Sequence, residues 1–119
     1  KVDGDIIHTF DGTSVNRYRM ALLYNSKNDL TLARRPTSGG WAGVQSSWLN
    51  MMISGPVLLE NGVVETYTSD NDHANLRHPR TAVGLTPSNK MILLVVDGRT
   101  TEAAGMSCTE LSNVLLELG

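Results

Sequence analysis

The unbroken apolar run at residues 91–96, Met-Ile-Leu-Leu-Val-Val, sets the tightest limit on the fold of this chain. A short continuous apolar run of this kind predicts a central strand that is covered on both faces. Helices then have to pack over the sheet that contains it. The run therefore predicts an α/β (α+β) fold class, with at least one helix packed on the sheet.

One such helix is expected soon after this strand, at about residues 108–118. Its apolar face follows the helical spacing i, i+3, i+4 and i+7 of Leu111, Val114, Leu115 and Leu118. Ser107 and Glu110 match a capping box, in which two side chains and two backbone N–H groups satisfy each other. Gly119 stands where a left-handed C-terminal cap would fall, so both ends of the helix are predicted.

Turn-forming residues divide much of the remaining chain into hairpins. Strand pairs are expected at residues 19–24 with 30–33, at 56–60 with 63–66, and at 80–86 with 90–96. The second pair has the strongest local signal, because Asn61-Gly62 supplies the two positive φ angles of a type I′ turn. The sheet is therefore predicted to be mixed but largely antiparallel.

Three segments are expected to lie outside regular structure. Residues 1–15 are predicted as a loop or a lone edge strand, and residues 34–47, rich in Pro and Gly, as a long surface loop. Residues 69–75 are polar apart from Ala74 and are predicted as an exposed loop. Loops as long as 34–47 often have a function.

The composition excludes several classes of protein. A length of 119 residues with 40% hydrophobic and 18% charged residues fits one globular domain, and not a disordered tail or a membrane protein. A net charge of -2 argues against a general nucleic-acid or anionic-membrane surface. The single cysteine, Cys108, excludes an intrachain disulfide and a metal site built from cysteines of this chain.

Charged residues follow the apolar strand directly, at Asp97-Gly98-Arg99. In sheets covered by helices, loops at the carboxyl ends of strands are where ligands bind. Asp97 can accept a proton or hydrogen bonds, Gly98 allows close backbone approach, and Arg99 offers a planar fork for a carboxylate or phosphate. The alternative is a plain solvated turn.

A second charged segment, Arg-His-Pro-Arg-Thr at residues 77–81, opens the preceding strand. Antiparallel pairing of 80–86 with 90–96 brings Arg80 and Thr81 close to Val96 and Asp97. We therefore predict that Arg80 and Asp97 share one pocket rim. The alternative is a surface ion pair between them, which would contribute at most about 1 kcal/mol.

Metal ligands are sparsely represented. The three histidines lack the i, i+4 spacing of a zinc site, and Asp70-Asn71-Asp72 lacks the glycine and distal glutamate of an EF-hand loop. No metal site and no cofactor are therefore predicted, with a divalent cation such as calcium as the alternative.

Three segments together resemble the phosphodiester glycosidase family, which includes the uncovering enzyme of lysosomal targeting and bacterial relatives. They are residues 77–84 (Arg-His-Pro-Arg-Thr-Ala-Val-Gly), residues 92–99 (Ile-Leu-Leu-Val-Val-Asp-Gly-Arg), and residues 104–106 (Ala-Gly-Met) with Glu110-Leu111. The resemblance is strongest over residues 54–118. Residues 1–119 are accordingly expected to form a single domain or an interior part of one phosphodiester glycosidase-like domain.

The resemblance implies an α/β fold and hydrolysis of a sugar-1-phosphodiester, with release of a sugar such as N-acetylglucosamine. It implies catalytic roles for Asp97, which would stabilise or attack an oxocarbenium-like centre, and for His78, which would carry a proton. It also implies substrate-binding roles for Arg77, Arg80, Thr81, Gly98 and Arg99. The relatives suggest an extracellular, periplasmic or cell-surface location, with exopolysaccharide as substrate.

Two segments of the family pattern are not found in the chain: an Asn-Gly-x-Phe-Phe type segment near the start and an Asp-Gly-Gly-Gly-Ser/Thr segment after the helix. A second catalytic carboxylate is therefore expected on a missing segment or a second chain, with Glu102 as the nearest substitute. The expected partner is a sugar phosphodiester or an anionic glycan, without nucleic acid or a membrane span. Two alternatives stay open: a non-catalytic module that binds anionic glycans, and a purely structural domain.

Overall fold

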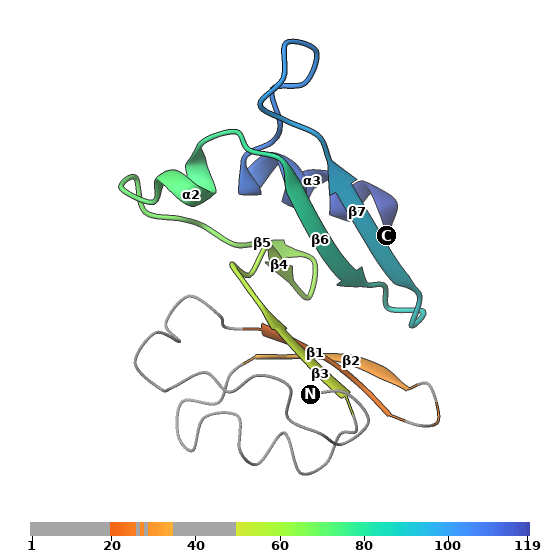
Figure 1. Ribbon diagram of the computed structural model, residues 1–119. Helices are drawn as coiled ribbons and strands as arrows, with labels where there is room; N and C mark the ends of the chain where they lie inside the picture. Colours follow the sequence, from red (N-terminus) through yellow and green to blue (C-terminus); the bar gives the residue numbers. More distant parts are fainter. Residues whose placement is uncertain (1–19, 26, 28, 35–49) are drawn as a thin grey trace. The chain divides into compact units, whose positions relative to one another are not determined.

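The computed structural model describes residues 20–25, 27, 29–34 and 50–119, which fall into two compact units (Figure 1). The units are Lys1–Pro56, called the N-terminal unit below, and Val57–Gly119, called the C-terminal unit. The described elements are antiparallel hairpins and helices, so the expected α+β fold class is confirmed.

The N-terminal unit contains a three-stranded antiparallel sheet in the order β2-β1-β3. Its strands are β1 (Met20–Tyr24), β2 (Leu30–Arg34) and β3 (Asn50–Ser54). The hairpin expected at 19–24 and 30–33 is confirmed by the β1–β2 pairing. The side-chain oxygen of Asn25 accepts hydrogen bonds from the backbone N–H groups of Lys27 and Asp29, at 2.9 and 3.1 Å, and this closes the turn.

Alternation along β1 provides the buried side chains of this unit. Ala21 and Leu23 are each only 1% exposed, while Tyr24 is at the surface. The strand β3 was not among the expected strands, although Met51-Met52-Ile53 is a short apolar run. The loop prediction for residues 34–47 is wrong at Arg34, which ends β2, and its other residues, like those of the prediction for 1–15, lie outside the described residues.

The C-terminal unit contains two short sheets and two helices (Figure 1). In chain order its elements are β4 (Leu59–Glu60), β5 (Val63–Val64), α2 (Asp72–Asn75), β6 (Arg80–Leu85), β7 (Met91–Val96) and α3 (Cys108–Leu118). The Asn-Gly turn is confirmed, because Asn61 has a φ of 52° and Gly62 a φ of 76°. The strands that it joins are only two residues long each.

The largest hairpin, β6–β7, and the helix α3 form the core of this unit. The pairing runs from Arg80 opposite Val96 to Leu85 opposite Met91, as the turn at residues 87–89 predicts. In Figure 1, α3 lies behind this hairpin. Apolar side chains from both sides meet there: Ala82, Leu111 and Leu115, with Leu58, Leu59, Ile92, Leu94, Val96 and Met106 around them.

The helix α3 begins and ends where the sequence predicts. The side-chain oxygen of Ser107 accepts from the N–H of Glu110, and the carboxylate of Glu110 accepts from the N–H of Ser107, which is the expected capping box. Gly119 follows the helix with a φ of 125°, in the region that favours glycine. The signals are local to the helix, and they therefore suffice to fix its bounds.

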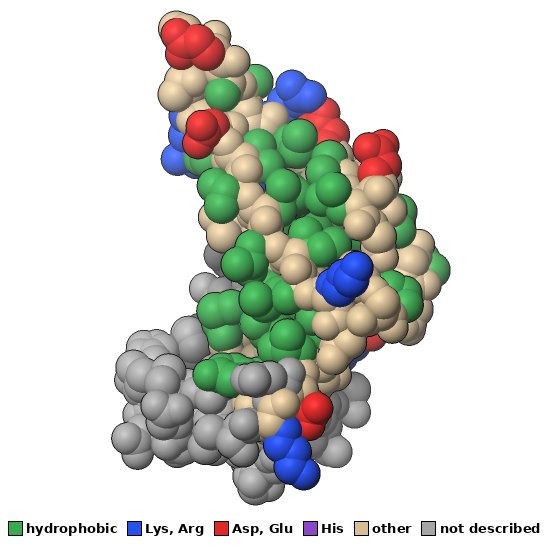
Figure 2. Space-filling model, turned by 90° about the vertical axis from the view of Figure 1, so that its right-hand side faces the viewer, with side chains coloured by type: hydrophobic (Ala, Val, Ile, Leu, Met, Phe, Trp, Pro, Cys, Tyr) green, Lys and Arg blue, Asp and Glu red, His purple; other side chains and the backbone are tan. Residues whose placement is uncertain are grey.

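The prediction that both faces of β7 are covered is wrong for the described residues. Ile92, Leu94 and Val96 face α3, but Leu93 and Val95 on the other face are 69% and 71% exposed. Figure 2 shows apolar side chains gathered on the side of the C-terminal unit that lies at the right in Figure 1. An apolar run shows which residues resist water but cannot by itself show what covers each face of a strand.

The prediction of an exposed loop at residues 69–75 is also wrong in part. Residues 72–75 form the short helix α2, whose N-terminus is capped by the side chain of Asn71, which accepts from the N–H of Ala74 at 3.2 Å. Ala74 is completely buried. An Asn cap stabilises a helix too short to show apolar periodicity, so the pattern was invisible.

None of the helices in the described part of the chain is long and apolar enough to cross a membrane.

Candidate active site

Three segments far apart in the sequence meet at one end of the β6–β7 hairpin. They are residues 77–81, 97–99 and 104–106, and we call their meeting point the junction. His78 and Met106 form an isolated antiparallel bridge, in which each N–H donates to the other's carbonyl, at 3.1 and 3.0 Å. The motifs that carry the family resemblance are therefore one physical unit.

Two glycines make this close approach of backbones feasible. A Cβ at Gly105 would lie 2.4 Å from the carbonyl oxygen of His78, and Gly105 also has a φ of 85°. A Cβ at Gly98 would lie 2.7 Å from the nitrogen of Pro79 and 2.9 Å from the Cα of Gly105. Contacts this short leave no room for a side chain, so the structure requires glycine at both positions.

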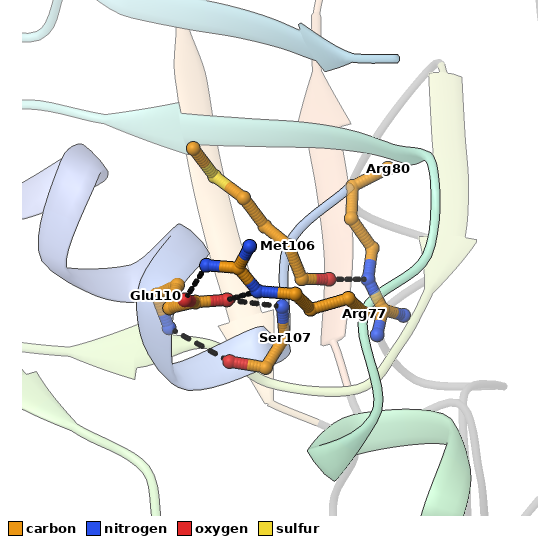
Figure 3. A network of polar contacts seen from close by, with 5 residues as sticks. All are labelled: Arg77, Arg80, Met106, Ser107 and Glu110. Carbon is orange, nitrogen blue, oxygen red and sulfur yellow. Dashed lines mark hydrogen bonds and ion pairs between the residues drawn. The ribbon is translucent and has the colours of Figure 1, made fainter. Parts of the chain in front are cut away.

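Arg80 lies inside the junction and is only 8% exposed. Its Nε donates to the carbonyl of Met106 at 2.9 Å (Figure 3), and its Nη2 donates to the carbonyls of His73 and Leu76 at 2.6 and 3.0 Å. A buried cation is tolerated only when its N–H groups are satisfied, as they are here. Arg80 thus ties the end of α2 to the loop that precedes α3.

Arg77 lies on the surface and forms a two-pronged ion pair with Glu110 at the start of α3 (Figure 3). The same carboxylate accepts the N–H of Ser107 at 2.9 Å. The bond from Arg77, followed by the bond from the Ser107 backbone, lowers the pKa of Glu110 to about 2. Glu110 therefore anchors the arginine segment and caps the helix with one side chain.

Arg99 and His78 are in direct contact at the outer side of the junction. The Nη2 of Arg99 lies 3.1 Å from the Nδ1 of His78, which is half-buried. Arg99 has a φ of 61°, a left-handed conformation that residues other than glycine rarely adopt. Backbone strain of this kind tends to persist at functional sites.

His73, on α2, was not predicted as a site residue. Its ring stacks on that of His78, with centroids 6.1 Å apart and planes 19° from parallel. Its Nε2 lies 3.4 Å from the Nη1 of Arg80. The Asn71 cap was the signal that could have placed His73 on a helical turn facing this segment.

The structure does not bring Arg80 and Asp97 into contact. The register pairs Arg80 with Val96, and the guanidinium of Arg80 turns inward to backbone carbonyls. Asp97 is exposed, and no described residue bonds to its carboxylate. Thr81 pairs with Val95 and is exposed on the face opposite to Arg80, because side chains alternate along a strand.

Metal ligands and a reactive thiol find no support among the described residues. They contain no group of three or more His, Cys, Asp or Glu side chains that could hold a metal ion. Cys108 is 1% exposed, and burial raises the pKa of its thiol, with partial opposition from Arg80. This environment is that of a packed side chain and not of a nucleophile.

The comparisons with known proteins agree with the motifs at the junction. A family model described as phosphodiester glycosidase matches residues 2–119. Neither a search of curated proteins nor a search of solved structures gives a match. Because the family match covers nearly the whole chain, the chain belongs to the phosphodiester glycosidase family.

Proposed function

We propose that the junction forms part of the active site of a hydrolase that releases a sugar such as N-acetylglucosamine from a sugar-1-phosphodiester. The observation that carries this proposal is the pair formed by Arg99 and His78, whose side chains are 3.1 Å apart. A guanidinium beside an imidazole is suited to an anion that must be held while a bond to it breaks. The family membership supports the same class of reaction.

Arg99 is the proposed phosphate ligand. A phosphodiester carries one negative charge, and a second charge develops on the departing phosphate when the bond to the sugar breaks. A fixed guanidinium stabilises that developing charge. The guanidinium groups of Arg77 and Arg80 are occupied by Glu110 and by three backbone carbonyls, respectively. We therefore propose that these two arginines hold the neighbouring site residues in place and do not bind the substrate themselves.

Asp97 is the proposed catalytic carboxylate. In the reaction, the bond between the anomeric carbon and the phosphate oxygen breaks, and its electron pair leaves with the phosphate monoester. Water supplies a hydroxyl group to the anomeric carbon and a proton to solvent or the phosphate. The carboxylate of Asp97, which is exposed and bonded to no described residue, would stabilise or attack the positively charged sugar carbon.

The substrate context and location are part of the proposal. Relatives associated with surface polysaccharide suggest that the natural phosphodiester belongs to an extracellular or cell-surface glycan. The observation in favour of a second function is that the junction combines Arg99 and two stacked histidines with a single exposed carboxylate, Asp97. Such a set would also suit a module that binds anionic glycans without turnover.

The test is an assay of the full-length protein with the methyl phosphodiester of N-acetylglucosamine-1-phosphate. Asp97→Asn should lower the rate of sugar release by about 100-fold or more, because the variant keeps the shape but loses the charge. Glu117→Gln, an exposed change at the far end of α3, is the matched control and should leave the rate unchanged. Full activity of Asp97→Asn refutes the proposed role, and saturable binding without turnover by the unmodified protein favours the binding module.

A further inference from the structure

We propose that Arg99, besides binding the phosphate, positions His78 and holds it as a neutral imidazole with its proton on Nε2. In this form His78 meets the phosphate as a hydrogen-bond donor and does not act as a proton-transfer group. The choice of phosphate as ligand rests on the proposed function. The form of the imidazole is inferred from the geometry of the two side chains alone.

The donor and acceptor of the contact follow from the chemistry of arginine. A guanidinium has five N–H donors and no acceptor, and it stays protonated in proteins. The contact of 3.1 Å between its Nη2 and the Nδ1 of His78 is therefore a hydrogen bond only if Nδ1 carries no proton. A neutral imidazole with a bare Nδ1 carries its single proton on Nε2.

The backbones that carry the two partners of this hydrogen bond are held in place. The backbone of His78 is held on both sides by the bridge to Met106, and its ring stacks on that of His73. The backbone of Arg99 follows Gly98, which is wedged against Pro79 and Gly105. A proton on Nδ1 would set two N–H groups against each other at 3.1 Å, so the contact as the structure shows it requires an Nδ1 without a proton.

The other nitrogen of the ring is the one available to a ligand. Nε2 of His78 is bonded to no described residue, and the side chain is only half-buried. On the far side of the stack, the 3.4 Å contact from Arg80 to Nε2 of His73 has the same polarity, with the guanidinium as donor. Each imidazole of the stack thus has an arginine beside one of its nitrogens.

This form of the imidazole changes the chemistry expected of His78. A neutral imidazole N–H donates a hydrogen bond but does not release its proton near neutral pH. The departing phosphate monoester is already a stable anion, so the broken bond does not need a proton from His78. A donor fixed beside the phosphate stabilises the charge that develops on its oxygen. The sequence predicts a proton carrier at this position, and the geometry points to a donor.

The first test reads the imidazole directly. In the 15N-labelled protein near neutral pH, long-range 1H–15N correlation should show His78 with an unprotonated Nδ1 and a protonated Nε2. Arg99→Met should move both nitrogen signals toward averaged positions, because the two neutral forms then exchange. Lys90→Met, which removes an exposed cation at the opposite end of the β6–β7 hairpin, should leave them in place. A proton on Nδ1 in the unmodified protein, or the same response in both variants, overturns the inference.

The second test separates a donor from a proton carrier. His78→Gln keeps an N–H donor but cannot exchange protons, whereas His78→Leu has neither property. If His78 acts as a donor, sugar release should fall by about 100-fold in His78→Leu and by less than about tenfold in His78→Gln. Equal losses in the two variants, with both folded, overturn the donor role. If the unmodified protein releases no sugar from any phosphodiester, the proposed function fails, and the correlation spectra still decide the form of the imidazole.

Discussion

Arg80 connects three parts of the C-terminal unit through a single guanidinium. Its carbonyl partners belong to His73, Leu76 and Met106. One side chain therefore satisfies backbone groups that come before β6 in the chain and others that come after it. Only a planar fork with several donors can do this, because a lysine ammonium at the same place is a compact point charge. The charge of Arg80 therefore matters less than its shape.

Replacing Arg80 by Lys should lower the free energy of unfolding by about 2 to 4 kcal/mol, because buried carbonyls and a poorly satisfied cation remain. Denaturation by guanidinium chloride measures the change. Arg77→Lys, a change in an exposed ion pair, is the control and should have a much smaller effect. Equal effects from both variants would show that the bonds of Arg80 are not what holds the junction.

The hydrogen-bond partners of the Arg80 guanidinium could not be predicted from the sequence. The sequence places a cation at the start of a strand whose partner strand ends in Asp97, and a nearby ion pair is the simplest expectation. The actual acceptor on Met106 lies 26 positions further along the chain and is a backbone atom. Backbone acceptors carry no signature in the side-chain pattern. The sequence therefore indicates which segments form the junction but does not predict the roles of its arginines.

At the scale of elements, local signals were sufficient for α3 and for the β6–β7 register. The capping box, the apolar face and the final glycine all lie within or next to the helix, and the turn at 87–89 fixes which residues of the strands pair. The prediction that both faces of β7 are covered was wrong, because burial of a strand face depends on which distant elements pack on it. The helix α2 was missed because four residues are too few for periodicity.

The ion pair of Glu110 with Arg77, and after it the capping bond to Ser107, make the stability of the C-terminal unit depend on pH. The pKa of Glu110 is lowered from 4.5 to about 2 in the folded protein. As the pH falls, the unfolded chain binds this proton first, so the contribution of Glu110 is complete above about pH 4.5 and is lost toward about pH 2. Urea denaturation at a series of pH values should therefore show a fall in this window that is smaller in Glu110→Gln.

The control for this acid response is a second carboxylate on the same helix. Glu117→Gln removes an exposed carboxylate from the other end of α3, and its curve should stay parallel to that of the unmodified protein. If the curve of Glu110→Gln is parallel as well, the bonds to Arg77 and Ser107 do not persist in solution.

At the scale of the whole molecule, the two glycines explain why the three motif segments occur together. Gly98 and Gly105 allow the segments 77–79, 97–99 and 104–106 to touch by their backbones. A substitution at either glycine should therefore displace His78 and Arg99, although these two residues themselves are unchanged. The motif order reflects a packing requirement as well as chemistry.

Gly105→Ala and Gly62→Ala form a matched pair that tests this requirement. Both glycines have positive φ angles, but a Cβ at Gly62 would meet nothing within 4 Å, while a Cβ at Gly105 would meet the His78 carbonyl at 2.4 Å. Gly62→Ala should cost about 1 kcal/mol of unfolding free energy from backbone strain alone. Gly105→Ala should cost about 3 kcal/mol or more and abolish sugar release. Equal costs would remove the close contact as a cause.

Backbone packing at the junction leaves the tip of its longest loop open to engineering. Thr100 and Ala103 close a small turn: the N–H of Thr100 donates to the carbonyl of Ala103 at 3.2 Å, and the Thr100 Oγ1 accepts from the N–H of Ala103 at 3.0 Å. Thr101 and Glu102, at the tip of this turn, are exposed. Since the only native thiol, Cys108, is buried, a cysteine introduced at Glu102 would take up a maleimide dye selectively. The dye would then report, from a few residues away, when an anion binds beside Arg99 and His78.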